Sequence, residues 1–248
     1  MVKVRTADAL FFEVQQAVNR HQPELTVSRT DNQIVLDGTF VVSGPDGPFD
    51  SYEIRAEITT AFPEEEPVVS ETSYRIPRTV DRHIFPIGGN CCLGIWEEWL
   101  LMAPDHRFES FLTGPMHDYF VSQTYYEIHG VWPFGERSHG MPGVLESYAD
   151  LLGVPLDART ITAYLRLLSR RQIKGHAICP CGSNKRLRHC HRNGLQRLSR
   201  KIPPAMANRM LNKIASINSG LASSRASRDG KRSSAQPVVA QVNKDIRN

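Results

Sequence analysis

The sequence lacks any long apolar run. No stretch of its 248 residues approaches the roughly 20 apolar residues that a transmembrane helix needs, so we expect no membrane span and no membrane partner. Residues 1–9 also lack the apolar segment of a secretory signal peptide. The expected location is therefore the cytoplasm.

Cysteine is scarce, and its five residues fall into two groups. Cys91 and Cys92 are adjacent, and adjacent cysteines rarely bridge each other. Cys179, Cys181 and Cys190 do not have the spacing of a secreted disulfide framework. In a reducing compartment such cysteines are typically catalytic or metal-binding, and one group of each kind would explain the pattern.

Acidic residues are almost absent from the last third of the chain. Residues 1–163 carry 11 Lys and Arg against 24 Asp and Glu, a net charge of −13, whereas residues 164–248 carry 19 against two, a net charge of +17. This indicates an acidic body with a basic arm. The arm could contact nucleic acid, an acidic partner or the body itself. It has no aromatic residues over 166–232, so stacking on single-stranded nucleic acid is not expected.

The periodicity of apolar residues predicts an α+β protein. Apolar residues at helical spacing predict a helix over about 7–20, and alternating residues predict strands that short turns join into an antiparallel meander. An irregular stretch of about thirty residues follows residue 77, and helices dominate after it. The strands are expected around 34–42, 52–58, 68–69 and 74–76, the helices after Pro115, around 144–152 and after Asp157, and the long loop includes Cys91, Cys92, Trp96 and Trp99.

Four residues near position 185 predict a metal site. Cys179 and Cys181, an eight-residue loop, and then Cys190 and His191 supply three sulfurs and one imidazole. Zinc prefers such a tetrahedral set, and a site closed by four protein ligands is structural rather than catalytic. Gly182 gives the chain freedom to turn around the ion.

The same segment resembles the SEC-C motif, Cys-Pro-Cys-Gly-Ser-x-Lys followed by Cys-His or Cys-Cys, which is known from the tail of the SecA translocation ATPase. The resemblance implies a structural zinc ion and a role in partner contact. His176 and His189 are other nearby histidines, but the resemblance favours His191 as the fourth ligand.

Upstream motifs occur in the order found in ubiquitin-conjugating (UBC) enzymes, and residues 5–128 resemble that fold. The helix and meander are followed by Phe62-Pro63 and Pro67, Ile76-Pro77, His83, the segment Gly89-Asn90-Cys91-Cys92-Leu93, and Trp99. In the family a histidine precedes the catalytic cysteine by about ten residues, a leucine follows that cysteine, and a tryptophan follows the active site. The resemblance therefore implies a UBC-like sheet with an N-terminal helix and C-terminal helices.

The resemblance assigns the catalytic cysteine to Cys92, with His83 nine residues before it. It implies that Cys92 carries the C-terminal glycine of a protein donor as a thioester and passes it to a lysine amine of a protein target. Cys91 has two interpretations: a second thiol in a relay with Cys92, or a small buried hydrophobic residue. Glu136 and His139 lie in a turn-rich loop that either borders the active site, with His139 as a base, or is a solvent loop.

One position departs from the family. Eukaryotic members have His-Pro-Asn, whose asparagine stabilises the oxyanion, whereas this chain has His83-Ile84-Phe85. Asn90 or backbone N–H groups would have to replace it. Bacterial members commonly lack that asparagine, so the departure indicates a bacterial subgroup. The adjacent cysteines resemble the conjugating proteins of antiphage cyclic-oligonucleotide (CBASS) operons, whose partners include a cGAS-like nucleotidyltransferase that becomes attached to targets.

The predicted protein is a UBC-like transferase for antiviral defence, in three parts. Residues 1–172 form the catalytic domain with a helical extension, residues 173–195 the zinc knuckle, and residues 196–248 a basic and largely disordered tail. The alternative is a catalytically inactive UBC-fold binding module that uses the knuckle and the tail for partner or nucleic-acid contact.

Overall fold

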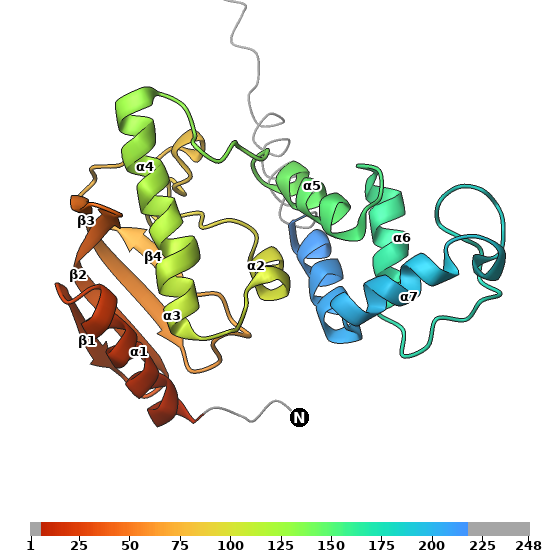
Figure 1. Ribbon diagram of the computed structural model, residues 1–248, viewed down its shortest axis with the longest axis horizontal. Helices are drawn as coiled ribbons and strands as arrows, with labels where there is room; N and C mark the ends of the chain where they lie inside the picture. The colour runs from red at the N-terminus through yellow and green to blue at the C-terminus, as the bar shows by residue number, and fades with distance from the viewer. Residues whose placement is uncertain (1–5, 218–248) are drawn as a thin grey trace, which may run out of the picture. The chain divides into compact units, whose positions relative to one another are not determined.

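The computed structural model describes residues 6–217 and divides the chain into two compact units. The first comprises Met1–His139 and Gly143–Leu156, and the second comprises Gly140–Pro142 and Asp157–Asn248. Figure 1 labels the helices and strands of both.

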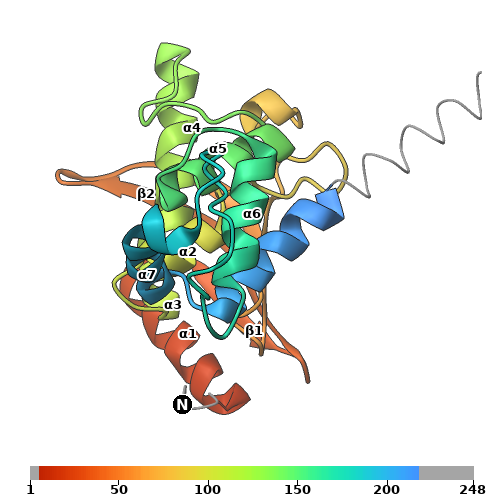
Figure 2. The same ribbon diagram turned by 90° about the vertical axis from the view of Figure 1, so that its right-hand side faces the viewer.

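The first unit is built on a four-stranded antiparallel sheet in the order β1-β2-β3-β4. This sheet confirms the predicted meander and the α+β class. Its strands are β1 (Leu25–Arg29), β2 (Gln33–Gly44), β3 (Gly47–Thr59) and β4 (Val68–Glu71). Figure 2 shows the long β2–β3 hairpin extending beyond the helices of its unit.

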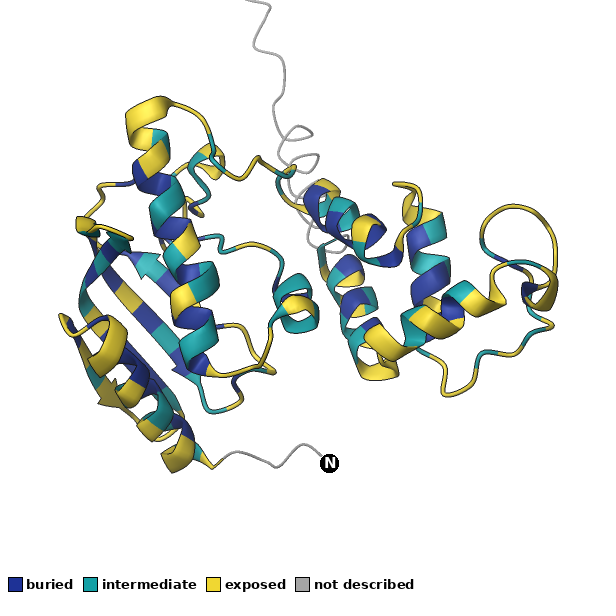
Figure 3. Ribbon diagram, viewed as in Figure 1, coloured by how far each residue is buried: buried dark blue, intermediate teal, exposed yellow. Residues whose placement is uncertain are grey.

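One face of the sheet carries the core of this unit. Buried and exposed residues alternate along β3 (Figure 3), because successive side chains point to opposite faces of a strand. Tyr52 and Phe40 pack against Phe120, with ring centroids 4.9 Å apart in both pairs. On the other face Arg55 bonds to Asp37 and Glu57, so that face is polar.

Helices α1 (Ala7–His21) and α4 (His117–His129) cover the apolar face. Thr6 caps α1 by accepting a hydrogen bond from the backbone N–H of Ala9 at 3.2 Å. The apolar stripe of this helix joins the same cluster of buried side chains as the sheet. The helix predicted over 7–20 is confirmed.

Two predictions about the following residues are wrong. No strand forms at 74–76, because Tyr74 has a left-handed backbone with φ 61°. Trp96 and Trp99 lie in helix α2 (Trp96–Met102), not in a loop. The helix predicted after Pro115 is confirmed: Gly114, with φ −106° and ψ −105°, breaks the chain within η2 (Leu112–Met116), which follows α3 (Phe108–Phe111), and helical backbone continues after Pro115 into α4. The helix predicted around 144–152 is α5 (Met141–Leu152).

The second unit contains α6 (Ala158–Leu168), the short turn η3 (Leu187–His189) and α7 (Arg192–Lys201). Asp157 caps α6 as predicted, accepting from the backbone N–H of Thr160 at 2.7 Å. No helix among residues 6–217 is long and apolar enough to cross a membrane.

The predicted disorder of residues 196–248 is wrong in its first part. Residues 192–201 and 204–217 are helical. Ala207, Met210 and Ile214 are buried, and their three- and four-residue spacing gives this helix an apolar stripe that can be packed. The remainder of the predicted tail, residues 218–248, lies outside the described residues.

Candidate functional site

The two adjacent cysteines lie on a short extended segment that pairs with β4. The backbone N–H of Cys91 donates to the Val69 carbonyl at 2.7 Å, and Ser70 and Asn90 form an antiparallel bridge. The Ser70 hydroxyl also donates to Oδ1 of Asn90 at 3.0 Å. The segment is therefore held by a rigid sheet and not by a free loop.

A second pairing separates the two thiols. Ile84 and Cys91 form an antiparallel bridge, and both side chains are buried, with exposed fractions of 1% and 9%. The next pair outward is His83 and Cys92, where the backbone N–H of Cys92 donates to the His83 carbonyl at 2.7 Å. Because neighbouring residues of an extended chain alternate between faces, Cys91 belongs to the core, whereas Cys92 is partly exposed beside His83.

The surroundings of Cys91 disfavour a thiolate. Burial has the largest effect on the pKa of this thiol and raises it to about 12. Hydrogen bonds with Tyr119 and with the backbone of Glu71 lower the pKa, but they oppose burial only in part. A thiol in this state is a poor nucleophile at neutral pH.

Side chains of α4 fix the backbone around His83. The Tyr119 hydroxyl donates to the His83 carbonyl at 3.2 Å, and the Gln123 amide donates to the Arg82 carbonyl at 2.8 Å. The guanidinium of Arg82 lies over the ring of Tyr126, 4.7 Å from its centroid. His83 itself adopts φ 50°, directly after the 3-10 turn η1 (Val80–Arg82).

The loop after α4 returns to the imidazole of His83. The ring centroid of Trp132 lies 4.8 Å and that of His139 lies 4.9 Å from the His83 ring. Glu136 Oε1 is 3.7 Å from Nε2 of His83 and 3.2 Å from Nε2 of His139. This placement favours the interpretation that the loop borders the cysteine segment over the interpretation that it is only a solvent loop.

These neighbours set the charge of His83. Burial lowers the pKa of its imidazole and the nearby His139 lowers it further, against the opposing effect of Glu136 and Asp81. The lowered pKa favours the neutral form of His83, and a neutral imidazole can accept a proton.

The turn before the cysteines depends on glycine. Gly88 and Gly89 have φ 85° and 71°, values that favour residues without a Cβ. A Cβ on Gly89 would lie 2.8 Å from the guanidinium of Arg78, which is stacked over Tyr74 at 3.8 Å from the ring centroid. The glycine pair thus lets the chain turn back toward β4 under Arg78.

The acidic side chains after the cysteines are held by other groups. Glu98 accepts hydrogen bonds from Arg137 at 3.2 Å and from Ser147 at 2.8 Å. Glu97 is buried in the first turn of α2. Trp96, stacked on Trp99 with ring centroids 4.4 Å apart, donates to the Pro63 carbonyl at 3.1 Å, so both tryptophans are structural anchors.

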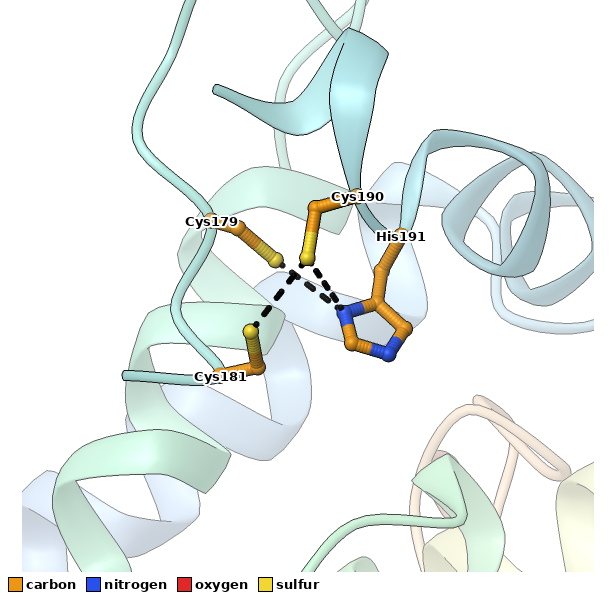
Figure 4. Close-up of side chains that lie close together, drawn as sticks. All are labelled: Cys179, Cys181, Cys190 and His191. Carbon is orange, nitrogen blue, oxygen red and sulfur yellow. Dashed lines mark hydrogen bonds between the residues drawn. The ribbon is translucent and has the colours of Figure 1, made fainter. Parts of the chain in front are cut away.

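In the second unit the four predicted metal ligands converge on one point (Figure 4). Sγ of Cys190 lies 3.5 Å from Sγ of Cys181 and 3.2 Å from Nδ1 of His191. Sγ of Cys179 lies 3.3 Å from the same Nδ1. A tetrahedral zinc site has ligand–ligand distances of about 3.6–3.8 Å, so small outward shifts would admit the ion, and the cluster could hold a metal.

A short hairpin builds this cluster. The backbone N–H of Cys179 donates to the Lys185 carbonyl at 2.8 Å, and Gly182 turns the chain at φ 81°. Hydrogen bonds with the side chain and the backbone of Ser183 lower the pKa of the Cys181 thiol to about 6, which favours the thiolate that a metal binds. His189 lies outside this cluster, and Arg188 donates to its Nε2 at 2.9 Å.

No family model, curated protein or solved structure matches the chain.

Proposed function

We propose that the chain is a ubiquitin-conjugating-like acyl carrier whose nucleophile is Cys92. The observation that carries this proposal is the contrast between the two adjacent thiols. Cys92 is partly exposed on a segment held by β4, and its backbone N–H donates to the carbonyl of His83, an imidazole whose pKa is lowered by burial. A thiol that must accept and release a protein carboxyl group needs this combination of access and rigid support.

The first step is a transthiolation or acyl transfer. The donor glycine must arrive activated, as an acyl adenylate or as a thioester on another protein. The Cys92 thiolate attacks its carbonyl carbon, the new S–C bond forms, and AMP or the other thiol leaves. No electrons are gained or lost by the chain, and the thiol proton passes to solvent or to the neighbouring imidazole.

The second step transfers the acyl group to an amine. A lysine nitrogen attacks the thioester carbonyl, the tetrahedral intermediate collapses, and the Cys92 thiolate leaves. The proton lost by the nitrogen passes to His83, which can accept it because its imidazole is neutral. Cys91 then has a structural role: its thiol lies in the core and stays protonated.

The oxyanion donor proposed here is the Asn90 side chain. The backbone N–H groups of Cys91 and Cys92 already donate to the carbonyls of Val69 and His83. The Asn90 oxygen accepts from Ser70, and this contact orients the carboxamide so that its NH2 group can donate to a developing negative charge.

The loading step can be tested with a synthetic peptide that ends in a glycine thioester. We expect a reductant-sensitive adduct on the wild-type chain, seen by intact mass. The adduct should be absent from Cys92→Ala and present on Cys179→Ser. An adduct of equal yield on Cys92→Ala would contradict the proposed nucleophile.

The transfer step can be tested by adding free lysine to the loaded chain. We expect His83→Gln to slow discharge at least about tenfold, in the range typical of a lost acid–base group. The exposed His129→Gln is the matched control and should discharge at the wild-type rate. Equal discharge by both variants would remove the role given to His83.

We also propose a donor, a target and roles for the second unit. The donor would be a protein ending in glycine, such as the cGAS-like nucleotidyltransferase of an antiphage operon, and the target a protein lysine. We propose that the Cys179–His191 knuckle holds structural zinc, and that the basic residues after it contact a partner or nucleic acid.

One observation favours the inactive binding module as a second candidate. Phe85 and Ile87, which follow His83, are 52% and 91% exposed, and exposed apolar side chains beside a loop are typical of contact surfaces. A chain that forms no adduct at Cys92 but loses partner binding on Phe85→Ser and Ile87→Ser would support this candidate.

A further inference from the structure

Besides the knuckle, one other group of metal-ligating side chains converges in the described residues. One ring nitrogen of His83, one of His139 and a carboxylate oxygen of Glu136 all lie within 4.8 Å of one another. They come from two segments of the first unit, one ending η1 and one following α4. The sequence gives no motif for this group, because the two segments are more than fifty residues apart.

Neighbouring contacts hold the second segment in this position. The side chain and backbone N–H of Ser138 donate to Glu146 at 2.6 and 3.0 Å. Arg137 donates to Asp150 at 2.7 Å and to Glu98 at 3.2 Å. The residues between Glu136 and His139 are thus bonded to α2 and α5, while Glu136 and His139 themselves lie against His83.

Packing also fixes the His83 ring. Trp132 lies edge-on to His83 with ring centroids 4.8 Å apart, and Tyr126 of α4 stacks on Trp132 at 4.4 Å. Because both the backbone and the ring of His83 are held from α4, its nitrogen is presented in a fixed direction. Side chains that are already held in place lose less conformational freedom when they bind an ion.

The distances suit a small divalent cation. Bonds of about 2.0–2.1 Å to imidazole nitrogen and carboxylate oxygen give tetrahedral ligand–ligand distances of about 3.3–3.4 Å. The two distances to Glu136, 3.2 and 3.7 Å, lie on either side of that value. Asp81 Oδ1, 3.9 Å from Nε2 of His139, adds a second negative charge.

The donor set indicates which cations fit. Two imidazoles and one carboxylate suit zinc and neighbouring transition metals, whereas magnesium and calcium prefer oxygen alone. Three protein ligands leave a coordination position open, unlike the four ligands of the knuckle.

We propose that His83, Glu136 and His139 form a second metal site, for zinc or a related divalent transition metal, next to the cysteine segment. A metal bound there occupies the lone pair on Nε2 of His83, so that the imidazole no longer accepts a proton. The consequence for lysine transfer rests on the proposed function: the metal-bound chain would discharge its acyl group more slowly.

Cobalt(II) can test the site on the full chain, because it substitutes for zinc and its spectrum distinguishes the ligands. After removal of bound metal under reducing conditions, we expect the wild-type chain to bind two equivalents. One gives the intense near-ultraviolet absorption of cobalt bound to thiolate and is absent from Cys179→Ser. The other gives only weak visible bands, as nitrogen and oxygen ligands do.

Two variants and one control assign the second equivalent. Glu136→Gln and His139→Ala should each weaken it at least about tenfold and leave the thiolate absorption unchanged, whereas the exposed His129→Ala should bind as the wild type does. Binding of a single equivalent by the wild-type chain would overturn the site, as would wild-type binding by both variants.

The acyl-carrier proposal and the second metal site can be contradicted independently. Loading of Cys92 with the glycine thioester is measured in a chelator. A chain that loads and binds only the thiolate-ligated equivalent contradicts the second metal site alone. A chain that binds both equivalents and never loads contradicts the acyl carrier alone.

Discussion

The cysteine pair of the first unit and the cysteine knuckle of the second use the same side chain in opposite ways. Cys91 and Cys92 are consecutive on extended backbone, so one thiol enters the core and the other stays accessible. Cys179 and Cys181 are two residues apart on a hairpin and point to a common centre. Spacing along the backbone therefore places Cys91 and Cys92 on opposite faces of one segment and brings Cys179 and Cys181 together.

The electrostatic surroundings of the thiols differ within the knuckle as well. Burial raises the pKa of Cys91 and of Cys179, while hydrogen bonds with Ser183 lower that of Cys181. In the knuckle, the thiolate is therefore favoured at the exposed Cys181 and disfavoured at the buried Cys179. In the cysteine pair, the buried thiol is kept neutral, and its neighbour is left beside a histidine.

The largest expected effect is loss of the knuckle. Cys179→Ser with Cys181→Ser should remove the bound zinc, because two of four ligands are lost. Binding to such a cluster contributes about 10 kcal/mol or more to folding of small zinc modules, so the second unit should lose helical content. Zinc content by mass spectrometry and far-ultraviolet circular dichroism measure this.

Cys91→Ser is the matched control and should keep its zinc. All three tryptophans, Trp96, Trp99 and Trp132, lie in the first unit, so their fluorescence should stay native in the double variant. Zinc retained by the double variant would show that the knuckle is not the site.

The next largest effect is selective alkylation of the cysteine pair. Burial raises the pKa of Cys91 to about 12 and also shields its thiol from reagents, whereas Cys92 is partly exposed. Iodoacetamide should therefore modify Cys92 much faster than Cys91 in the folded chain. Peptide mapping measures both rates, and equal modification would contradict the burial of Cys91.

A smaller effect concerns acid stability of the first unit. Burial alone would raise the pKa of Asp50, but hydrogen bonds from Arg75 and Thr124 dominate in sum and lower it to about 2. Because the folded pKa lies below the unfolded value of about 3.9, this carboxylate stabilises the fold by about 2 kcal/mol at pH 7, and the contribution is lost as pH falls from about 5 to 2.

The Asp50→Asn variant should therefore unfold at a lower urea concentration than the wild type at pH 7. Between pH 7 and pH 3 its free energy of unfolding should fall by less than that of the wild type. Tryptophan fluorescence follows both transitions. Asp46→Asn, an exposed change in the same hairpin, should track the wild type. If Asp50→Asn keeps the full acid sensitivity of the wild type, the Asp50–Arg75 pair is not its source.

The smallest effect is expected for the turn that leads into the cysteine pair. Gly89→Ala forces a Cβ into a backbone with φ 71° and toward the Arg78 guanidinium, which costs about 1–2 kcal/mol. Urea unfolding measures the loss. Gly130→Ala has the same φ of 71° but open space around its Cβ, so the difference between the two variants isolates the contact with Arg78.

Sequence patterns predicted the parts of the molecule that depend on local periodicity. Alternation around Tyr52 and Ile54 specified β3, the helical spacing of Leu10 and Val14 specified α1, and the knuckle spacing specified four ligands that do converge. In each case the pattern reflects a face that must be buried or side chains that converge on one point.

Tertiary contacts determined what the sequence did not show. Strand β1 has one buried residue, Leu25, too little for a periodic signal. Glu136 and His139 contact His83 because the loop after α4 comes back to the turn that contains His83. No local sequence pattern predicts this long-range contact. The different surroundings of Cys91 and Cys92 follow from the bridge between Ile84 and Cys91, which only the folded chain shows.

The most direct test of the central claim is a comparison of Cys91→Ala with Cys92→Ala after exposure to the glycine-thioester peptide. Both variants keep one thiol of the pair, so intact mass and peptide mapping assign the acyl group without ambiguity. The account predicts an adduct on Cys91→Ala, mapped to Cys92, and none within the pair on Cys92→Ala. An adduct on Cys91 in the Cys92→Ala chain, at wild-type yield, would contradict it.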